Sequence, residues 1–129
     1  MRLLLDTQIA LWWLVGSPRL SRAVRKKLAE SPCAVSVASV WEVAIKHGLG
    51  KLPVPPRDFR DELAAAGVVF MAITESHALA TSDLPPGHID PFDLLLLATA
   101  QCEGMQLATA DAALLRYAES YPGLRVMGV

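Results

Sequence analysis

Short apolar runs alternate along the chain with longer segments in which apolar residues recur at helical spacing. The runs predict strands at Leu3–Leu5, Ala34–Val37, Val68–Ala72, Gln106–Thr109 and Leu124–Met127. The segments between them predict a helix capped by Thr7 and broken at Gly16, a second from near Ser21 to Pro32, and others over residues 39–47, 58–66, 75–81, 91–103 and 111–119. Strands that are apolar on both faces and alternate with helices indicate an α/β sandwich with a mainly parallel sheet.

The length and composition of the chain fit one such unit. At 129 residues we expect a single domain over residues 1–129, because two domains would each be too small to bury a core. Hydrophobic residues make up 53% of the sequence, which leaves apolar surface for a partner. Cys33 and Cys102 are expected to be buried free thiols in a reducing compartment. No apolar stretch reaches the ~18 residues of a membrane span and no leader is recognisable, so a cytoplasmic location is expected.

Charge is distributed unevenly along the chain. The formal net charge is −1, which by itself disfavours a polyanionic partner. Residues 1–57, however, carry nine basic and three acidic side chains, a balance of +6, whereas residues 58–129 carry three basic and ten acidic ones, a balance of −7. An asymmetry of this kind favours a nucleic-acid partner more than the total suggests.

Two groups of side chains could contact such a partner. The basic cluster Arg19, Arg22, Arg25, Lys26 and Lys27 supplies candidate contacts to a phosphate backbone, the alternative being an ordinary solvated helix face. Trp12, Trp13 and Trp41 stand at helical spacings, which favours packing in the core or in a dimer interface over base stacking.

Acidic residues are placed where parallel sheets bind ligands. Asp6 and Asp111 lie at or just beyond the ends of predicted strands, and Glu42 lies one turn into the helix after another strand. Asp93, in the first turn of the helix that Asp90 caps, is a fourth candidate. Ligands bind at the carboxyl edge of open parallel sheets, where four carboxylates would repel one another unless a cation lay among them. Oxygen-only ligands suit Mg²⁺ or Mn²⁺, which can activate water and hold a phosphodiester.

Each of these acids also has a structural alternative. Asp6 can be a turn or cap residue, although an acid directly after three leucines is costly unless it is used. Glu42 can form a solvated ion pair with Lys46, four residues further on. Asp93 stands where a carboxylate favours the helix dipole, and Asp111 can cap the last helix. The signal is therefore their shared position at one edge of the sheet.

Four segments occur in an order and spacing typical of one nuclease family. They are Leu4-Leu5-Asp6-Thr7 with Leu11-Trp12-Trp13-Leu14, Ser39-Val40-Trp41-Glu42-Val43-Ala44-Ile45-Lys46 with Gly50-Lys51-Leu52, His88-Ile89-Asp90-Pro91-Phe92-Asp93, and Thr109-Ala110-Asp111. In these segments, which span nearly the whole chain, the sequence resembles the PIN-domain ribonucleases. The closer likeness is to the VapC-type toxins of bacterial toxin–antitoxin pairs.

The resemblance implies a three-layer α/β/α PIN fold and an endoribonuclease that depends on Mg²⁺ or Mn²⁺. It implies that the acidic site consists of Asp6, Glu42, Asp93 and Asp111. Thr7 and Thr109 would support that site by orienting ligands or water. A homodimer and a cognate antitoxin whose tail covers the active-site groove are also implied. The chain departs from the family pattern at Leu94, where the family usually carries Arg.

Two other functions are compatible with the same residues. One is a PIN-type nuclease of RNA processing that has no antitoxin, and the other is a catalytically silent module that binds RNA or protein. Hydrolysis by water, which the acidic site predicts, leaves 5′-phosphate and 3′-hydroxyl ends and requires the metal. Binding of RNA without any cut would indicate the silent module, and a neighbouring short gene for a small DNA-binding protein would separate the toxin from the processing nuclease.

Overall fold

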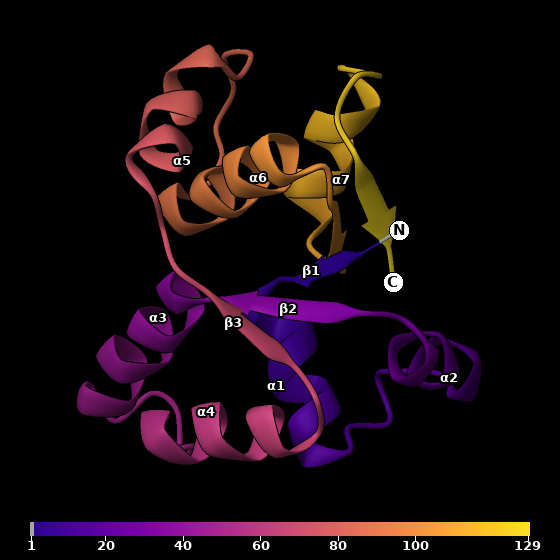
Figure 1. Cartoon of the computed structure of the whole chain (residues 1–129), viewed down its shortest axis with the longest axis vertical. Helices are drawn as coiled ribbons and strands as arrows, with labels where there is room; N and C mark the ends of the chain where they lie inside the picture. The colour runs from indigo at the N-terminus through magenta and orange to yellow at the C-terminus, as the bar shows by residue number, and fades with distance from the viewer. Residues whose placement is uncertain (1) are drawn as a thin grey trace.

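The computed structural model describes residues 2–129 as a central sheet between two layers of helices (Figure 1). The strands are β1 (Leu3–Leu5), β2 (Cys33–Ser36), β3 (Val69–Met71), β4 (Gln106–Thr109) and β5 (Val126–Gly128). The helices are α1 (Thr7–Val15), α2 (Arg22–Glu30), α3 (Val37–Gly48), α4 (Pro56–Ala65), α5 (Glu75–Ala80), α6 (Pro91–Glu103) and α7 (Ala112–Glu119), with a 3₁₀ turn, η1 (Thr81–Asp83). The predicted alternation of strands and helices is confirmed.

The sheet has the strand order β3-β2-β1-β4-β5, and each of these neighbouring pairs is parallel. The chain moves outward from β1 through β2 to β3 and then crosses to the other side of β1 to form β4. The carboxyl ends of β1 and β4 therefore flank the point at which the strand order reverses, which is where open α/β sheets bind ligands.

Alternate strand residues pack into a core on each face of the sheet. Leu3 and Leu5 join the core under α1 to α4, whereas Leu4 joins the core under α6 and α7. Leu4 and Leu5 are both 0% exposed, and full burial of such a side chain stabilises a fold by about 1.5–3 kcal/mol. The central strand is apolar throughout because helices cover both of its faces.

Side-chain caps move the starts of α1 and α3 from their predicted positions, and α4 begins at Pro56 instead of the predicted residue 58. Asp6, not Thr7, caps α1, and its carboxylate accepts the backbone N–H of Ile9 at 2.8 Å. The hydroxyl of Ser36 accepts the N–H of Ala38 at 3.0 Å, so α3 begins two residues before the predicted Ser39. In both cases a side chain at the end of a strand satisfies the first free amides of the next helix.

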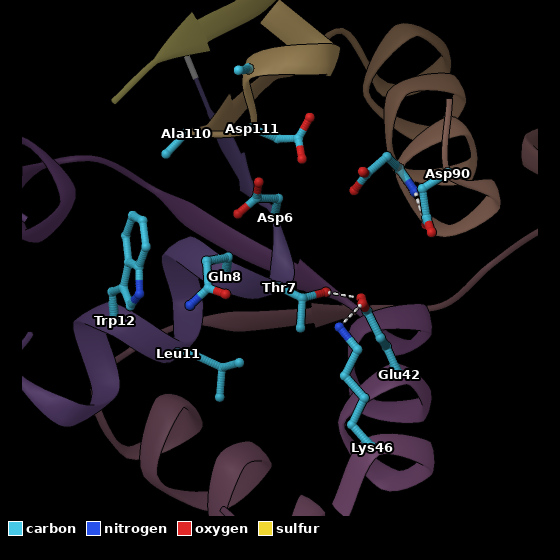
Figure 2. Close-up of a pocket in the computed structure, with 12 residues that line it drawn as sticks. Asp6, Thr7, Gln8, Leu11, Trp12, Glu42, Lys46, Asp90, Ala110 and Asp111 are labelled. Atoms are coloured by element: carbon cyan, nitrogen blue, oxygen red, sulfur yellow. Dashed lines mark hydrogen bonds and ion pairs between the residues drawn. The ribbon is translucent and has the colours of Figure 1, made fainter. Parts of the chain in front are cut away.

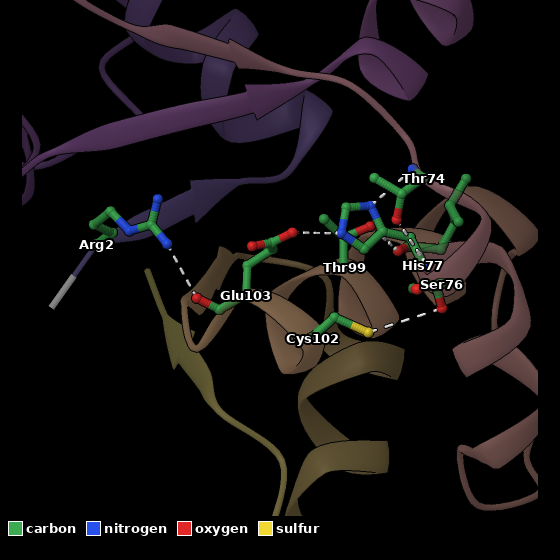
Figure 3. A network of polar contacts seen from close by, with 8 residues as sticks. Arg2, Thr74, Ser76, His77, Thr99, Cys102 and Glu103 are labelled. Carbon is green, nitrogen blue, oxygen red and sulfur yellow. Dashed lines mark hydrogen bonds and ion pairs between the residues drawn. The ribbon is translucent and has the colours of Figure 1, made fainter.

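A buried polar network fastens α5 to α6 (Figure 3). His77 is 1% exposed, and its Nδ1 accepts the backbone N–H of Thr74 at 3.1 Å. The proton of the neutral ring is therefore on Nε2, which donates to Glu103 Oε1 at 2.7 Å. The guanidinium of Arg2 donates to the carbonyl of Glu103 at 3.1 Å, which links the network to the start of β1.

The two cysteines occupy different environments. Cys33 is buried in β2, as predicted, but Cys102 is exposed, so the expectation of a second buried thiol is wrong. The buried residues of α6 are Leu96 to Ala100, and Cys102 turns away from that core toward α5. Within residues 2–129, the structure contains no helix with the length and apolar character needed to cross a membrane.

Candidate active site

A cavity of about 460 Å³ opens beside the carboxyl ends of β1 and β4 (Figure 2). Among the described residues, its wall carries five carboxylates, those of Asp6, Glu42, Asp90, Asp93 and Asp111. The structure therefore places all four predicted site acids around one cavity, together with the helix-capping Asp90. The strand ends position two of these acids directly, and the helices after β2 and before β4 carry the others.

Asp6 is the most deeply buried of these acids, at 4% exposure. Its Oδ1 accepts the N–H of Ile9, and its Oδ2 accepts the hydroxyl of Thr109. Thr109 in turn accepts the backbone N–H of Asp111 at 3.0 Å, which couples the ends of β1 and β4. Burial raises the pKa of Asp6, repulsion from Asp111 and Glu42 raises it further, and the two hydrogen bonds partly oppose this rise.

Glu42 faces the cavity from α3 and is held at both carboxylate oxygens. Oε1 accepts the hydroxyl of Thr7 at 2.6 Å, and a further hydrogen bond of 2.9 Å joins the hydroxyls of Thr7 and Ser39. Oε2 forms the predicted ion pair with Lys46 Nζ at 2.8 Å, and the hydrogen bond to Glu42 raises the pKa of Lys46. Both residues line the cavity, where the Glu42 side chain is 15% exposed and the Lys46 side chain 52%.

Asp90 and Asp93 reach the cavity from the first turn of α6. Asp90 caps the helix as predicted, accepting the N–H of Phe92 at 2.9 Å. Partial burial raises the pKa of Asp93 to about 7, and repulsion from the other cavity carboxylates, first that of Asp90, adds to the rise. Asp111 also has its structural role, since it caps α7 by accepting the N–H of Leu114 at 2.9 Å. Capping and a place in the cavity wall are thus compatible for the same residue.

The donor set of the cavity fits a hard divalent cation. In the described chain, no three histidine, cysteine, aspartate or glutamate side chains stand close enough together to hold a metal ion by direct contact. Mg²⁺ usually keeps several of its waters and uses only one or two carboxylates. The described part of the wall offers carboxylate oxygens but no histidine or cysteine, and these carboxylates disfavour one another's charged forms. Such a donor set suits a partly hydrated Mg²⁺ or Mn²⁺ ion.

Sequence reasoning did not assign some of the cavity wall. Gln8 and Trp12 line the cavity from α1, where their spacing of four residues puts them on one face of the helix. Lys46 also lines it, and its spacing from Glu42 was the available signal. Trp41 was expected in the core or in a dimer interface. It is not in the core, since it is 63% exposed and contacts Phe92 with ring centroids 5.5 Å apart.

The predicted phosphate contacts on α2 lie away from the cavity. Figure 1 shows α2 beside the start of β2, at the end of the sheet opposite the start of α3. Arg22, Arg25, Lys26 and Lys27 do not contribute to the cavity wall. Arg25 is partly buried and donates to the backbone carbonyls of Ser17 and Leu20. The other three are exposed and remain candidate RNA contacts.

Comparison with known proteins gives consistent matches along the chain. The sequence model of the PIN domain matches residues 3–120. Ribonuclease VapC22 of Mycobacterium tuberculosis is 33% identical over 125 residues, which cover 92% of this chain and 94% of that relative.

Solved structures share the same fold. VapBC2 from Rickettsia felis, bound to a DNA fragment from its promoter, gives a TM-score of 0.71 at 18% identity, covering 99% of this chain and 98% of the other. DNA-bound VapBC from Salmonella typhimurium gives a TM-score of 0.69 at 20% identity, with the same coverage of both chains. The predicted three-layer α/β/α architecture is confirmed.

Proposed function

The chain belongs to the PIN-domain family, and we propose that its residues 1–129 form one nuclease domain, a metal-dependent endoribonuclease that acts as the toxin of a toxin–antitoxin pair. A relative named as a ribonuclease supports the activity, and solved complexes titled VapBC support the partner. The observation that carries the proposal is the gathering of four acids at one cavity, namely Asp6, Glu42, Asp93 and Asp111.

We assign these four acids as the residues that would hold a partly hydrated Mg²⁺ or Mn²⁺ ion, directly or through its waters. When bound, such an ion supplies Lewis-acid activation of water and offsets the negative charge of the phosphodiester. The carboxylates of Asp6 and Glu42 are held in place in advance, because Asp6 accepts a hydrogen bond at each oxygen and Glu42 accepts the hydroxyl of Thr7 at Oε1. Thr109 and Thr7 are the hydroxyl donors in these contacts, which gives both threonines the supporting role that the family resemblance implies.

The reaction is hydrolysis of an RNA phosphodiester. A water oxygen forms a new bond to phosphorus while the bond from phosphorus to the 3′ oxygen breaks, and the departing oxygen takes up a proton. The products carry 5′-phosphate and 3′-hydroxyl ends. Holding the reacting groups in a fixed geometry is the contribution that this wall can make to the rate.

Cleavage of total RNA, with and without a chelator, tests this function. Wild-type protein should cut in Mg²⁺ or Mn²⁺, and Asp6→Asn should reduce the rate by at least ~100-fold because it removes a charge from the centre of the site. Asp58→Asn, an exposed acid in the first turn of α4, is the matched control and should cut normally. Cleavage that continues in chelator, or that Asp6→Asn leaves unchanged, would falsify the metal mechanism. RNA binding without any cut would favour the silent module.

The antitoxin and the homodimer are tested separately. The neighbouring reading frame should encode a short DNA-binding protein, and co-expression with it should suppress cleavage. An exposed apolar row on α3 is the candidate dimer surface, formed by Val37, Trp41, Ile45 and Leu49 at spacings of four residues. Leu49, which is 64% exposed, lies just beyond the helix and can be changed without opening a cavity. Leu49→Glu should shift the sedimentation of the protein from dimer to monomer, and an unchanged dimer would remove this row from the interface.

A further inference from the structure

Lys46 is the single basic residue among the described residues that line the acidic cavity. Its ammonium faces a wall with five carboxylates, and its side chain is 52% exposed, so it can move into the cavity without leaving a core. Figure 2 shows the Lys46 chain rising along α3 to meet Glu42 at the cavity mouth. A polyanion that enters this cavity therefore meets one positively charged side chain, that of Lys46.

The Lys46 ammonium has N–H donors that Glu42 does not engage. A lysine carries three N–H donors, and within residues 2–129 the structure gives the Lys46 side chain one acceptor, Glu42 Oε2 at 2.8 Å. Glu42 does not depend on Lys46 for its position, since Thr7 holds the other carboxylate oxygen at 2.6 Å. The lysine can therefore leave Glu42 Oε2, and Glu42 stays in the wall.

We propose that Lys46 is a substrate-binding residue, whose ammonium leaves Glu42 Oε2 and binds a non-bridging phosphate oxygen of single-stranded RNA in the cavity. This inference rests on the nuclease function proposed above and adds a residue to it. The exchange frees one Glu42 oxygen at the moment when the substrate brings further negative charge. The basic residues of α2 cannot take this part, because they lie at the opposite end of the sheet.

RNA binding and kinetics of charge variants test the proposal. The probe is a short fluorescein-labelled single-stranded RNA, titrated by anisotropy in Ca²⁺ at about 50 and 200 mM KCl, with kcat and KM measured in Mg²⁺. The variants are Lys46→Gln and Lys46→Arg. Lys51→Gln makes the same charge change at an exposed position after α3 that does not line the cavity.

Loss of one phosphate contact has a defined signature. Lys46→Gln should raise both Kd and KM about tenfold at the lower salt concentration, which is the weight of one charged hydrogen bond. Raising KCl from about 50 to 200 mM should weaken RNA binding by the wild type about threefold more than binding by Lys46→Gln. The variant makes one phosphate contact fewer, so its binding releases one counterion fewer. The value of kcat should stay within about threefold, Lys46→Arg should restore most of KM, and Lys51→Gln should resemble the wild type.

Other outcomes would overturn the proposal. A Lys46→Gln variant with lower kcat but unchanged KM, Kd and salt dependence would make Lys46 a support for Glu42 only. If Lys51→Gln has an equal effect, Lys46 contributes only general surface charge and makes no specific phosphate contact. If the wild type cuts no RNA, the nuclease function itself fails, which is a different result from an active wild type with an unaffected Lys46→Gln variant.

Discussion

Asp93→Asn should stabilise the metal-free protein above neutral pH. In the folded chain, partial burial and repulsion from the neighbouring carboxylates raise the pKa of Asp93 from 3.8 to about 7. That difference corresponds to about 4 kcal/mol at about 1.4 kcal/mol per pH unit. Asp93 is partly exposed, so solvent screening reduces this figure, and the charged form gains about 0.3–1 kcal/mol from the α6 dipole. We expect a net gain of about 1–2 kcal/mol in the free energy of unfolding.

The sign of the pH dependence follows from proton binding. Between about pH 4 and 7 the folded protein holds a proton on Asp93 that the unfolded chain has released, so the stability of the wild type falls as pH rises through this window. Asparagine carries no titratable proton. The stability difference between Asp93→Asn and wild type should therefore be near zero at about pH 4, grow up to about pH 7 and stay constant above it.

Urea unfolding in EDTA, repeated at several pH values, measures this difference. Asp58→Asn is the matched control, and its difference from wild type should not grow across the same window. Adding Mg²⁺ should stabilise the wild type more than Asp93→Asn, because the variant has lost one of the proposed ligands. An Asp93→Asn protein that is less stable than the wild type in EDTA at pH 8, or a difference that does not change with pH, would refute the argument.

Three further substitutions test single contacts. Thr109→Val keeps the volume but removes the hydroxyl that donates to Asp6, so unfolding free energy should fall by about 1–3 kcal/mol and kcat by about tenfold. In Gly87→Ala, the new Cβ would lie 2.8 Å from the Tyr117 ring, so it should cost about 1–3 kcal/mol and lower activity by displacing the loop that leads into α6. His77→Phe should cost a similar amount in thermal unfolding and leave cleavage intact, because His77 joins α5 to α6 away from the cavity.

The sequence predicted elements best where local chemistry and tertiary structure agree. The bounds of α6 and β4 are as predicted, because Asp90 and Pro91 open the helix and Gly104 closes it at a φ of 64°. The start of α3 was misplaced because Val37 favours a strand by its own preference. The cap made by Ser36 outweighs that preference and starts the helix at Val37.

The gathering of the four candidate acids at one edge of the sheet was predictable, whereas their contacts in the cavity wall were not. Asp6 follows β1 directly and Asp111 lies two residues beyond the end of β4, so parallel pairing alone brings them to one edge. Which face of α3 turns toward that edge depends on the packing of Val43 into the core, which local sequence does not specify. For that reason the spacing of Lys46 and Glu42 predicts their ion pair but not its place in the cavity wall.

The structure shows where the charges of the basic and acidic halves of the chain lie relative to the cavity. The cavity is lined by Asp6 and Glu42 from the basic residues 1–57 and by Asp90, Asp93 and Asp111 from the acidic residues 58–129. Without Asp6, Glu42 and Lys46, residues 1–57 carry eight basic side chains and one acidic one, a balance of +7. Much of that charge lies on α2, at the far end of the sheet. It can attract RNA over a distance of about one Debye length, ~8–10 Å, whereas the proposed phosphate contact inside the cavity is that of Lys46.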